Sequence, residues 1–256
     1  MVLIESKRKK RENILKKYPD AIIADVTSHA EDDLIKLSPF YPHGGIPVPF
    51  SEGVTATCVE AVWQGLKVFE SADVDMKMFK NESMKNIKRT VRKFGKPLGH
   101  RKGVNGTELF GYIEARKLIY IPTYKWVLEH KVQSIIERLR EASQTKTIVL
   151  LDYNTNCDVD DPKKPLSHAF LIKAYVEGLY PFGDKKWKPQ TIESKQSGNS
   201  QLLKTAETLR SNFKNDVIDK LIQASDNQLT FEEYLKGLYH QGVIDMDDFT
   251  ICWLYE

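Results

Sequence analysis

The stretch that decides the fold is residues 58–69, Cys58-Val59-Glu60-Ala61-Val62-Trp63-Gln64-Gly65-Leu66-Lys67-Val68-Phe69. At about 100° per residue, this segment is apolar over nearly its whole circumference, which predicts a largely buried helix over roughly 58–70. The exception is one narrow polar stripe of Glu60, Gln64 and Lys67, with Trp63 beside it. Burying charged groups without partners is costly, so the stripe has to be satisfied by something outside the helix.

The two charged members of the stripe are too far apart on a helix to satisfy each other. Glu60 and Lys67 would be separated by about 10 Å along the axis, beyond the i,i+4 spacing of helical ion pairs. A ligand, water or another segment would then lie between them, as in a binding cleft. The stripe could instead reach solvent, or pair with the loop of residues 38–49, and the sequence does not decide among these arrangements.

Two motifs in this region resemble a known family. Ser38-x-Phe40-Tyr41-Pro42, followed by Glu60-x-x-x-Gln64-x-x-Lys67-x-Phe69, is similar to the opening of the NADAR superfamily. The resemblance implies a small, helix-rich N-glycosidase that hydrolyses ADP-ribose from modified guanine bases or cleaves ribosyl-phosphate intermediates of riboflavin synthesis. It implies that Glu60 and Lys67 are active-site residues. Four further residues are then expected to bind substrate: Phe40, Tyr41, Trp63 and Gln64.

Cleavage of an N-glycosidic bond needs particular groups in the site. The reaction passes through an oxocarbenium-like state, which calls for a negative group near the sugar and a donor or anchor for the leaving base. Glu60 could stabilise the cation or activate water, and Gln64 could orient sugar hydroxyls. Lys67 could act as an acid, a transient covalent partner or a phosphate ligand. The sequence leaves these roles open, and we expect neither a metal nor a cofactor.

A second cluster of basic residues and glycines lies between residues 88 and 102. We expect an amphipathic helix over 83–94 with outward basic side chains, followed by a glycine-rich basic loop over 95–106. This pattern suits a phosphate or a nucleic-acid backbone, and a solvated basic face would produce it equally well. The expected contacts are Arg89, Arg92, His100 and Arg101. An alternative function follows, a non-catalytic nucleotide- or nucleic-acid-binding protein that uses this segment.

A third feature is the run of carboxylates after an apolar strand. Residues 147–152 have the pattern of a buried strand that ends at Asp152, which we expect to reach the site as a third catalytic candidate. The following residues, 153–165, are expected to form a polar loop. Asp158 and Asp160 lack the spacing of a calcium loop. His168 has no ligand spacing around it and is expected to be a satisfied structural histidine, as is His43.

The remaining elements follow from hydrophobic periodicity and composition. We expect a strand at 21–26, irregular structure over 37–57, and helices at 5–17, 122–142 and 166–180. The expected fold class is α+β, predominantly helical, with a NADAR-like core over residues 1–182 and few short strands. Residues 183–200 are expected to form a linker, and residues 201–256 a C-terminal helical extension, which could instead bind a protein partner through its aromatic residues.

Composition sets the remaining limits. The chain has 256 residues, a formal charge of +3 and three cysteines with no Cys-x-x-Cys, so neither a disulfide framework nor a cysteine zinc site is expected. The order of apolar and basic residues at the N-terminus does not suit a signal peptide, and no apolar run is long enough to span a bilayer. We therefore expect a cytoplasmic protein with no membrane contact. Its expected partner is a phosphorylated ribosyl or ADP-ribosyl small molecule, or a modified nucleic acid.

Overall fold

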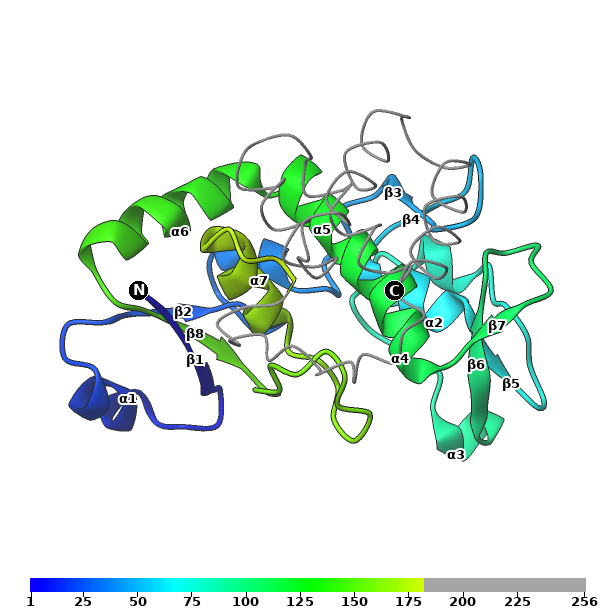
Figure 1. The fold of residues 1–256 in the computed structure, drawn as a ribbon, viewed down its shortest axis with the longest axis horizontal. Helices are drawn as coiled ribbons and strands as arrows, with labels where there is room; N and C mark the ends of the chain where they lie inside the picture. The colour runs from blue at the N-terminus through cyan, green and yellow to red at the C-terminus, as the bar shows by residue number, and fades with distance from the viewer. Residues whose placement is uncertain (182–256) are drawn as a thin grey trace, which may run out of the picture. The chain divides into compact units, whose positions relative to one another are not determined.

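A computed structural model describes residues 1–181 of the chain (Figure 1). These residues form a mixed α+β fold with small sheets, which confirms the expected class at that level. The expected linker over 183–200 and the helical extension over 201–256 lie outside the described residues. None of the helices within residues 1–181 is long and apolar enough to cross a membrane.

The fold is organised around a parallel sheet in which β8 (Ile148–Asp152) lies between β1 (Val2–Ser6) and β2 (Ile22–Asp25). β1 pairs with all five residues of β8 and β2 pairs with the first four, and all five residues of β8 are buried. The strands expected at 21–26 and 147–152 are confirmed. Because the strands are parallel, their carboxyl ends meet at one edge of the sheet, where ligands commonly bind in such sheets.

Helices pack on this sheet through alternating side chains of β8. Val149 and Leu151 contact Ile14 of α1 (Arg11–Lys17). The alternate residues Ile148, Leu150 and Asp152 point to the opposite face, because successive strand side chains alternate. On that side α7 (His168–Val176) packs against β8 (Figure 1). This arrangement brings His168, at the start of α7, next to Asp152.

The deciding segment forms a shorter helix than expected. Helix α2 covers Val59–Gly65, and all of its residues except Trp63 are buried, so the prediction of a buried helix is confirmed. The expected extension to residue 70 is wrong, because Lys67–Phe69 form strand β5. Gly65 packs so closely that an added Cβ would lie 2.2 Å from the ring of Phe79, and the chain leaves the helix after this position.

Strand β5 belongs to an antiparallel sheet with β6 (Pro97–Arg101) and β7 (Leu109–Phe110). The prediction of a loop over 95–106 is therefore wrong for residues 97–101, which form β6. Lys67 lies opposite His100 in the register of β5 and β6. The glycine-rich composition of 95–106 does not reveal that part of this segment pairs with another strand. A second short antiparallel pair lies within the segment expected to be irregular: β3 (Ile46–Pro47) and β4 (Thr55–Ala56).

Three expected helices differ from those observed. The helix over 83–94 is reduced to α3 (Val91–Phe94), since Ile87 and Arg89 turn into the interior from irregular backbone. The helix over 5–17 is replaced by β1 and α1, because the N-terminal residues complete the parallel sheet. The helix over 122–142 is divided into α5 (Ile121–His130) and α6 (Gln133–Thr145).

Short helical segments complete the described chain. Two are 3-10 helices, η1 (Asp33–Leu37) and η2 (Met78–Lys80). Before α5 the chain forms α4 (Tyr112–Ala115) and then a π-helix, η3 (Arg116–Tyr120). π-helical turns are rare and often occur at functional sites, and η3 faces the cavity described next.

Candidate functional site

A cavity of about 430 Å³ lies between the carboxyl ends of β8 and β2, helix α2 and the segment α4–η3. Its volume is in the range of small-molecule sites, roughly 300–1,000 Å³. Six of the residues expected in a site contribute to its wall: Phe40, Glu60, Trp63, Gln64, Lys67 and Asp152. The polar stripe of α2 therefore faces a cavity, and all three catalytic candidates lie around the same space.

Gln64 connects the two charged residues of the stripe. Its amide Nε2 donates to Glu60 Oε1 at 2.8 Å, and its Oε1 accepts from Lys67 Nζ at 3.2 Å. The same Oε1 also accepts from the backbone N–H of Arg89 at 3.0 Å. Because a backbone N–H can only donate, this contact fixes the orientation of the Gln64 side-chain amide. Glu60 Oε1 therefore has to be an acceptor. Most of the hydrogen-bonding capacity of Gln64 is used within the protein, which leaves little for sugar hydroxyls.

Burial moves the two charged groups of this network away from their ordinary pKa values. Desolvation raises the pKa of Glu60, against the opposing influence of Gln64, Lys67 and Lys88. Desolvation also lowers the pKa of Lys67, aided by Arg89 and Lys88 and opposed by Glu60. Both shifts are in the direction that improves proton transfer near neutral pH. Among the described residues, Glu60 Oε2 has no hydrogen-bond partner.

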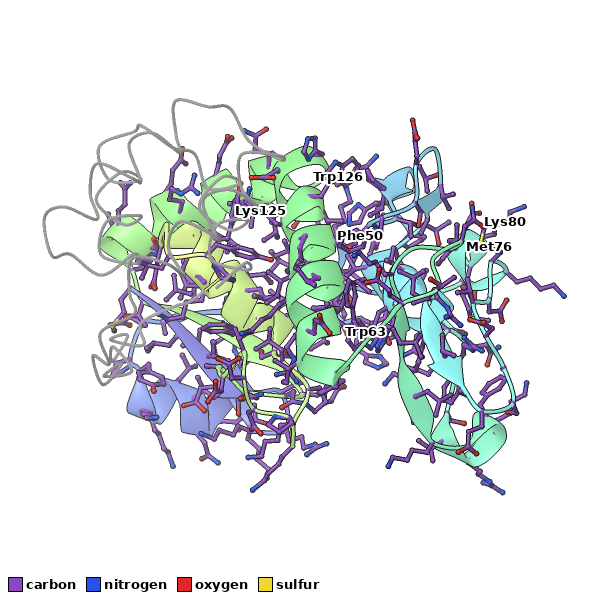
Figure 2. The ribbon with its side chains drawn as sticks, turned by 45° about the vertical axis from the view of Figure 1, so that its right-hand side comes forward. Phe50, Trp63, Met76, Lys80, Lys125 and Trp126 are labelled. Atoms are coloured by element: carbon purple, nitrogen blue, oxygen red, sulfur yellow. The ribbon has the colours of Figure 1, made fainter. Side chains whose placement is uncertain are left out.

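Aromatic side chains form another part of the cavity wall. Trp63 lies between the β5–β6–β7 sheet and the α4–η3 segment (Figure 2). Its ring packs against His100 with centroids 3.7 Å apart and ring planes inclined by 32°, and it meets Tyr112 and Tyr120 edge-on at 5.9 and 5.7 Å. Phe40 also lines the cavity. Such a wall suits a flat heteroaromatic group.

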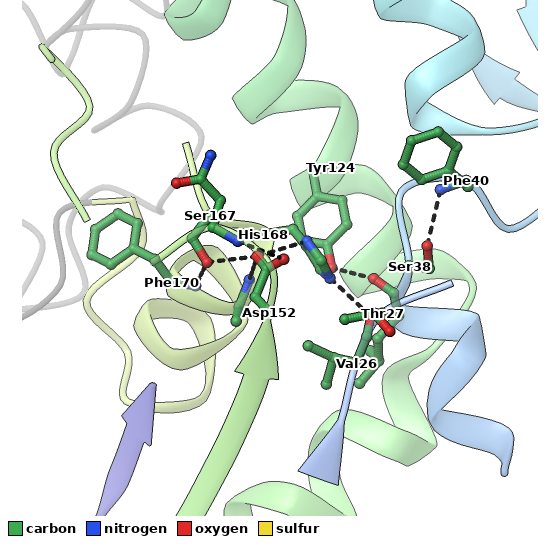
Figure 3. Close-up of polar contacts among 12 residues, drawn as sticks. Val26, Thr27, Ser38, Phe40, Tyr124, Asp152, Ser167, His168 and Phe170 are labelled. Atoms are coloured by element: carbon green, nitrogen blue, oxygen red, sulfur yellow. Dashed lines mark hydrogen bonds and ion pairs between the residues drawn. The ribbon is translucent and has the colours of Figure 1, made fainter. Parts of the chain in front are cut away.

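Asp152 is held in a different way from Glu60, through contacts with Ser167 and His168 (Figure 3). Its Oδ2 is 3.0 Å from Nδ1 of His168 and accepts from Ser167 Oγ at 2.7 Å. The other ring nitrogen of His168, Nε2, is 2.8 Å from the carbonyl of Val26. Both ring nitrogens thus face acceptors, an arrangement that favours the imidazolium.

The pKa values of this pair shift in opposite directions. Burial alone would raise the pKa of Asp152, but His168 and Ser167 lower it to about 2. Burial would lower the pKa of His168, but Asp152 and the carbonyl of Val26 raise it. The satisfied ring nitrogens agree with the structural histidine expected from the sequence, and His168 also lines the cavity. Asp152 is an ion-pair partner, so its geometry does not suit a general base.

The other expected binding residues do not line the cavity. Arg89 is 5% exposed, and its guanidinium donates to the carbonyls of Gln64, Lys67 and Asp73. His100 is 2% exposed, its ring nitrogens have no partner among the described residues, and desolvation lowers its pKa to about 3.

The remaining expected contacts also face elsewhere. Arg101 pairs with Asp73 at 2.6 Å, Arg92 is exposed on α3, and Tyr41 packs against His43. The expected basic face over 88–102 is thus divided among side chains that face inward, a side chain paired with an acid, and exposed side chains.

The structure adds cavity residues that the sequence analysis did not select. They include Thr27, Lys88, Tyr112, Arg116, Tyr120, Asn154 and His168. Lys88 Nζ lies 5.5 Å from the centre of the Phe40 ring and has no carboxylate partner among the described residues. Tyr112, Arg116 and Tyr120 recur at intervals of four, a helical spacing that could have identified them as one wall. Thr27 and Asn154 follow strands β2 and β8, which is a second usable signal.

Metal ligation finds no support in the described residues. Within residues 1–181, no group of three or more His, Cys, Asp or Glu side chains is placed to hold a metal ion.

The fold and cavity define an α+β protein with a partly enclosed, charged site at the edge of a parallel sheet. The chain belongs to DUF6939, a family of unknown function, which matches residues 6–172. No curated protein and no solved structure matches the chain.

Proposed function

We propose that the protein is an N-glycosidase that hydrolyses a base–ribose bond in an ADP-ribosylated base or a related ribosyl-phosphate compound. The observation that carries the proposal is the buried Glu60, linked through Gln64 to Lys67 in the wall of a cavity with an aromatic side. The resemblance of residues 38–42 and 60–69 to the NADAR superfamily supports it, because Glu60 and Lys67 coincide with its active-site glutamate and lysine.

Glu60 is assigned the role of general base. In the carboxylate form, Oε2 takes a proton from water as the water oxygen bonds to C1′ of the ribose. Its raised pKa makes it a stronger base than an exposed glutamate. The same negative charge stabilises the oxocarbenium-like transition state.

Lys67 is assigned the role of proton donor to the leaving base. The electron pair of the C1′–N bond moves to the base nitrogen, which takes a proton from the ammonium group. The lowered pKa of Lys67 favours this transfer. Water supplies one proton to Glu60 and the hydroxyl to C1′, and the base receives one proton from Lys67, so the products are the free base and the phosphorylated ribosyl compound with a hydroxyl at C1′. Transfer of the proton from Glu60 to Lys67 through solvent restores the starting state. Gln64 keeps the two groups oriented throughout.

The walls of the cavity suit the two parts of this substrate. Trp63, which lines the cavity and packs against His100, offers an aromatic surface to the base. Lys88 is a cation without a carboxylate partner among the described residues and is positioned to attract a phosphate. The proposed substrate is therefore a phosphorylated ribosyl compound, and the site does not require the basic segment 88–102 to act as one surface.

The test is release of free base. The full chain is incubated separately with ADP-ribosylated DNA and with free ribosyl nucleotides, and released base and sugar are identified by mass spectrometry. We expect release from one of the substrates with the wild type and none with Glu60→Gln or Lys67→Ala. The exposed residues Glu137 and Lys163 provide the matched controls Glu137→Gln and Lys163→Ala. Equal release by Glu60→Gln and the wild type would overturn the assignment.

A further inference from the structure

A second cavity lies beside the first at the same edge of the parallel sheet. It has a volume of about 540 Å³ and shares Tyr153 and Asn154 with the first cavity. The first cavity includes Thr27, which follows β2, and the second includes Ser6, the last residue of β1. Since β8 lies between β1 and β2, the two cavities lie on either side of the residues that follow β8.

The lining of the second cavity is polar and carries two cations. Arg8 and Lys164 are both exposed, and their side chains have no hydrogen bond or ion pair among the described residues. One carboxylate, Asp158, is part of the same lining, and its Oδ1 accepts from the backbone of Asp160. The two cations outnumber this carboxylate, so the described lining has a net positive charge and favours an anion.

The loop that forms this lining is fixed in place by buried interactions. The guanidinium of Arg116, which is 2% exposed, donates to the carbonyls of Asp158, Val159, Asp161 and Lys164. Asn156 Nδ2 donates to the carbonyls of Asp158 and Lys164. Arg116 also lines the first cavity, so one residue supports both walls. A preorganised loop loses less entropy when a ligand binds.

We propose that the second cavity binds a phosphate group that continues the substrate beyond the ribose, so that one ligand occupies both cavities. This inference rests on the proposed function, because the base–ribose bond is placed in the first cavity. It selects a diphosphate-linked ribosyl substrate over a ribosyl monophosphate. Tyr153 and Asn154, which line both spaces, are the residues that the linking group has to pass.

The experiment compares two probes, ADP-ribose and ribose 5-phosphate, by isothermal titration calorimetry on the full chain. The variant Arg8→Ala/Lys164→Ala removes both cations of the second cavity. The control Arg11→Ala/Lys163→Ala removes the same charges from exposed positions outside it. We expect the first variant to lose about tenfold in affinity for ADP-ribose and to bind ribose 5-phosphate as the wild type does. The control should bind both probes normally.

Three results would overturn the proposal: no binding of ADP-ribose by the wild type, wild-type affinity in the Arg8→Ala/Lys164→Ala variant, or equal losses for both probes. Binding of inorganic phosphate that depends on Arg8 and Lys164, with no preference for ADP-ribose, would show an isolated anion site and would also overturn it. Failure of the hydrolytic function is distinguishable. In that case ADP-ribose binding would still depend on Arg8 and Lys164, while no tested substrate would release base.

Discussion

Glu60 and Asp152 are two buried carboxylates in one cavity wall, yet the protein moves their pKa values in opposite directions. Glu60 accepts a hydrogen bond from a neutral amide, and desolvation raises its pKa. Asp152 contacts the ring of His168 at 3.0 Å, and its pKa falls to about 2. Divergent pKa values of neighbouring acids commonly mark different roles. Under the proposed function, Glu60 is the reactive carboxylate, and Asp152 holds His168 and Ser167 in place.

The largest expected effect is on catalysis. Replacing Glu60 by Gln removes the proposed base and keeps the side-chain shape, so we expect kcat for base release to fall roughly a thousandfold. Single-turnover assays of released base provide the measurement. The thermal midpoint should stay the same or rise, because a buried charge is removed. If Asp152→Asn abolished turnover and Glu60→Gln did not, the two roles would be reversed.

The next effect is on stability. Asp152→Asn leaves the imidazolium of His168 without its charged partner, and we expect the free energy of unfolding to fall by about 3 kcal/mol. Denaturant unfolding measures the loss. The exposed ion pair between Asp160 and Lys117 supplies the control, because Asp160→Asn should cost under about 1 kcal/mol.

A double variant tests whether that loss comes from the pair. Asp152→Asn/His168→Gln removes both charges and should be less destabilised than Asp152→Asn alone. If the double variant lost as much stability as Asp152→Asn and His168→Gln lose together as single variants, the two groups would not interact.

The strand that carries Asp152 could be predicted from sequence because its evidence is local. Residues 148–151 are an unbroken apolar run, and the polar stripe of Glu60, Gln64 and Lys67 is visible from helical spacing alone. The partners of these residues were not predictable in the same way. His168 lies opposite Asp152 only because α7 packs on β8, and Lys67 leaves the helix because β6 pairs with β5. In the sequence Arg89 resembles a surface cation, because the backbone carbonyls that accept its hydrogen bonds, those of Gln64 and Asp73, lie far from it along the chain.

A smaller effect concerns pH, and the two carboxylates should give opposite signs. The pKa of Asp152 is lowered in the folded state, so its stabilisation is present above the unfolded value of 3.8 and is lost as the pH falls toward about 2. The pKa of Glu60 is raised, so stability declines as the pH rises through the range between its unfolded and folded values. Urea unfolding at several pH values measures both.

The variants assign each slope to its residue. Asp152→Asn should flatten the change below pH 4, worth about 2 kcal/mol in the wild type. Glu60→Gln should flatten the decline in stability that occurs as the pH rises above the unfolded pKa of Glu60. If each variant altered the other slope, the opposite pKa shifts would be assigned to the wrong residues.

The smallest expected effect would sharpen the comparison by perturbing one carboxylate alone. Lys88 lowers the pKa of Glu60 by its charge, whereas the shift of Asp152 comes mainly from burial, His168 and Ser167. Lys88→Ala should therefore raise the pKa of Glu60 further, so that the acid limb of the kcat–pH profile moves to higher pH. Acid unfolding, which follows Asp152, should not change. Lys93→Ala, beside Phe94 and away from the cavity, is the matched control. A matching movement of the acid limb in Lys93→Ala would mean that net charge, and not the position of Lys88, controls Glu60.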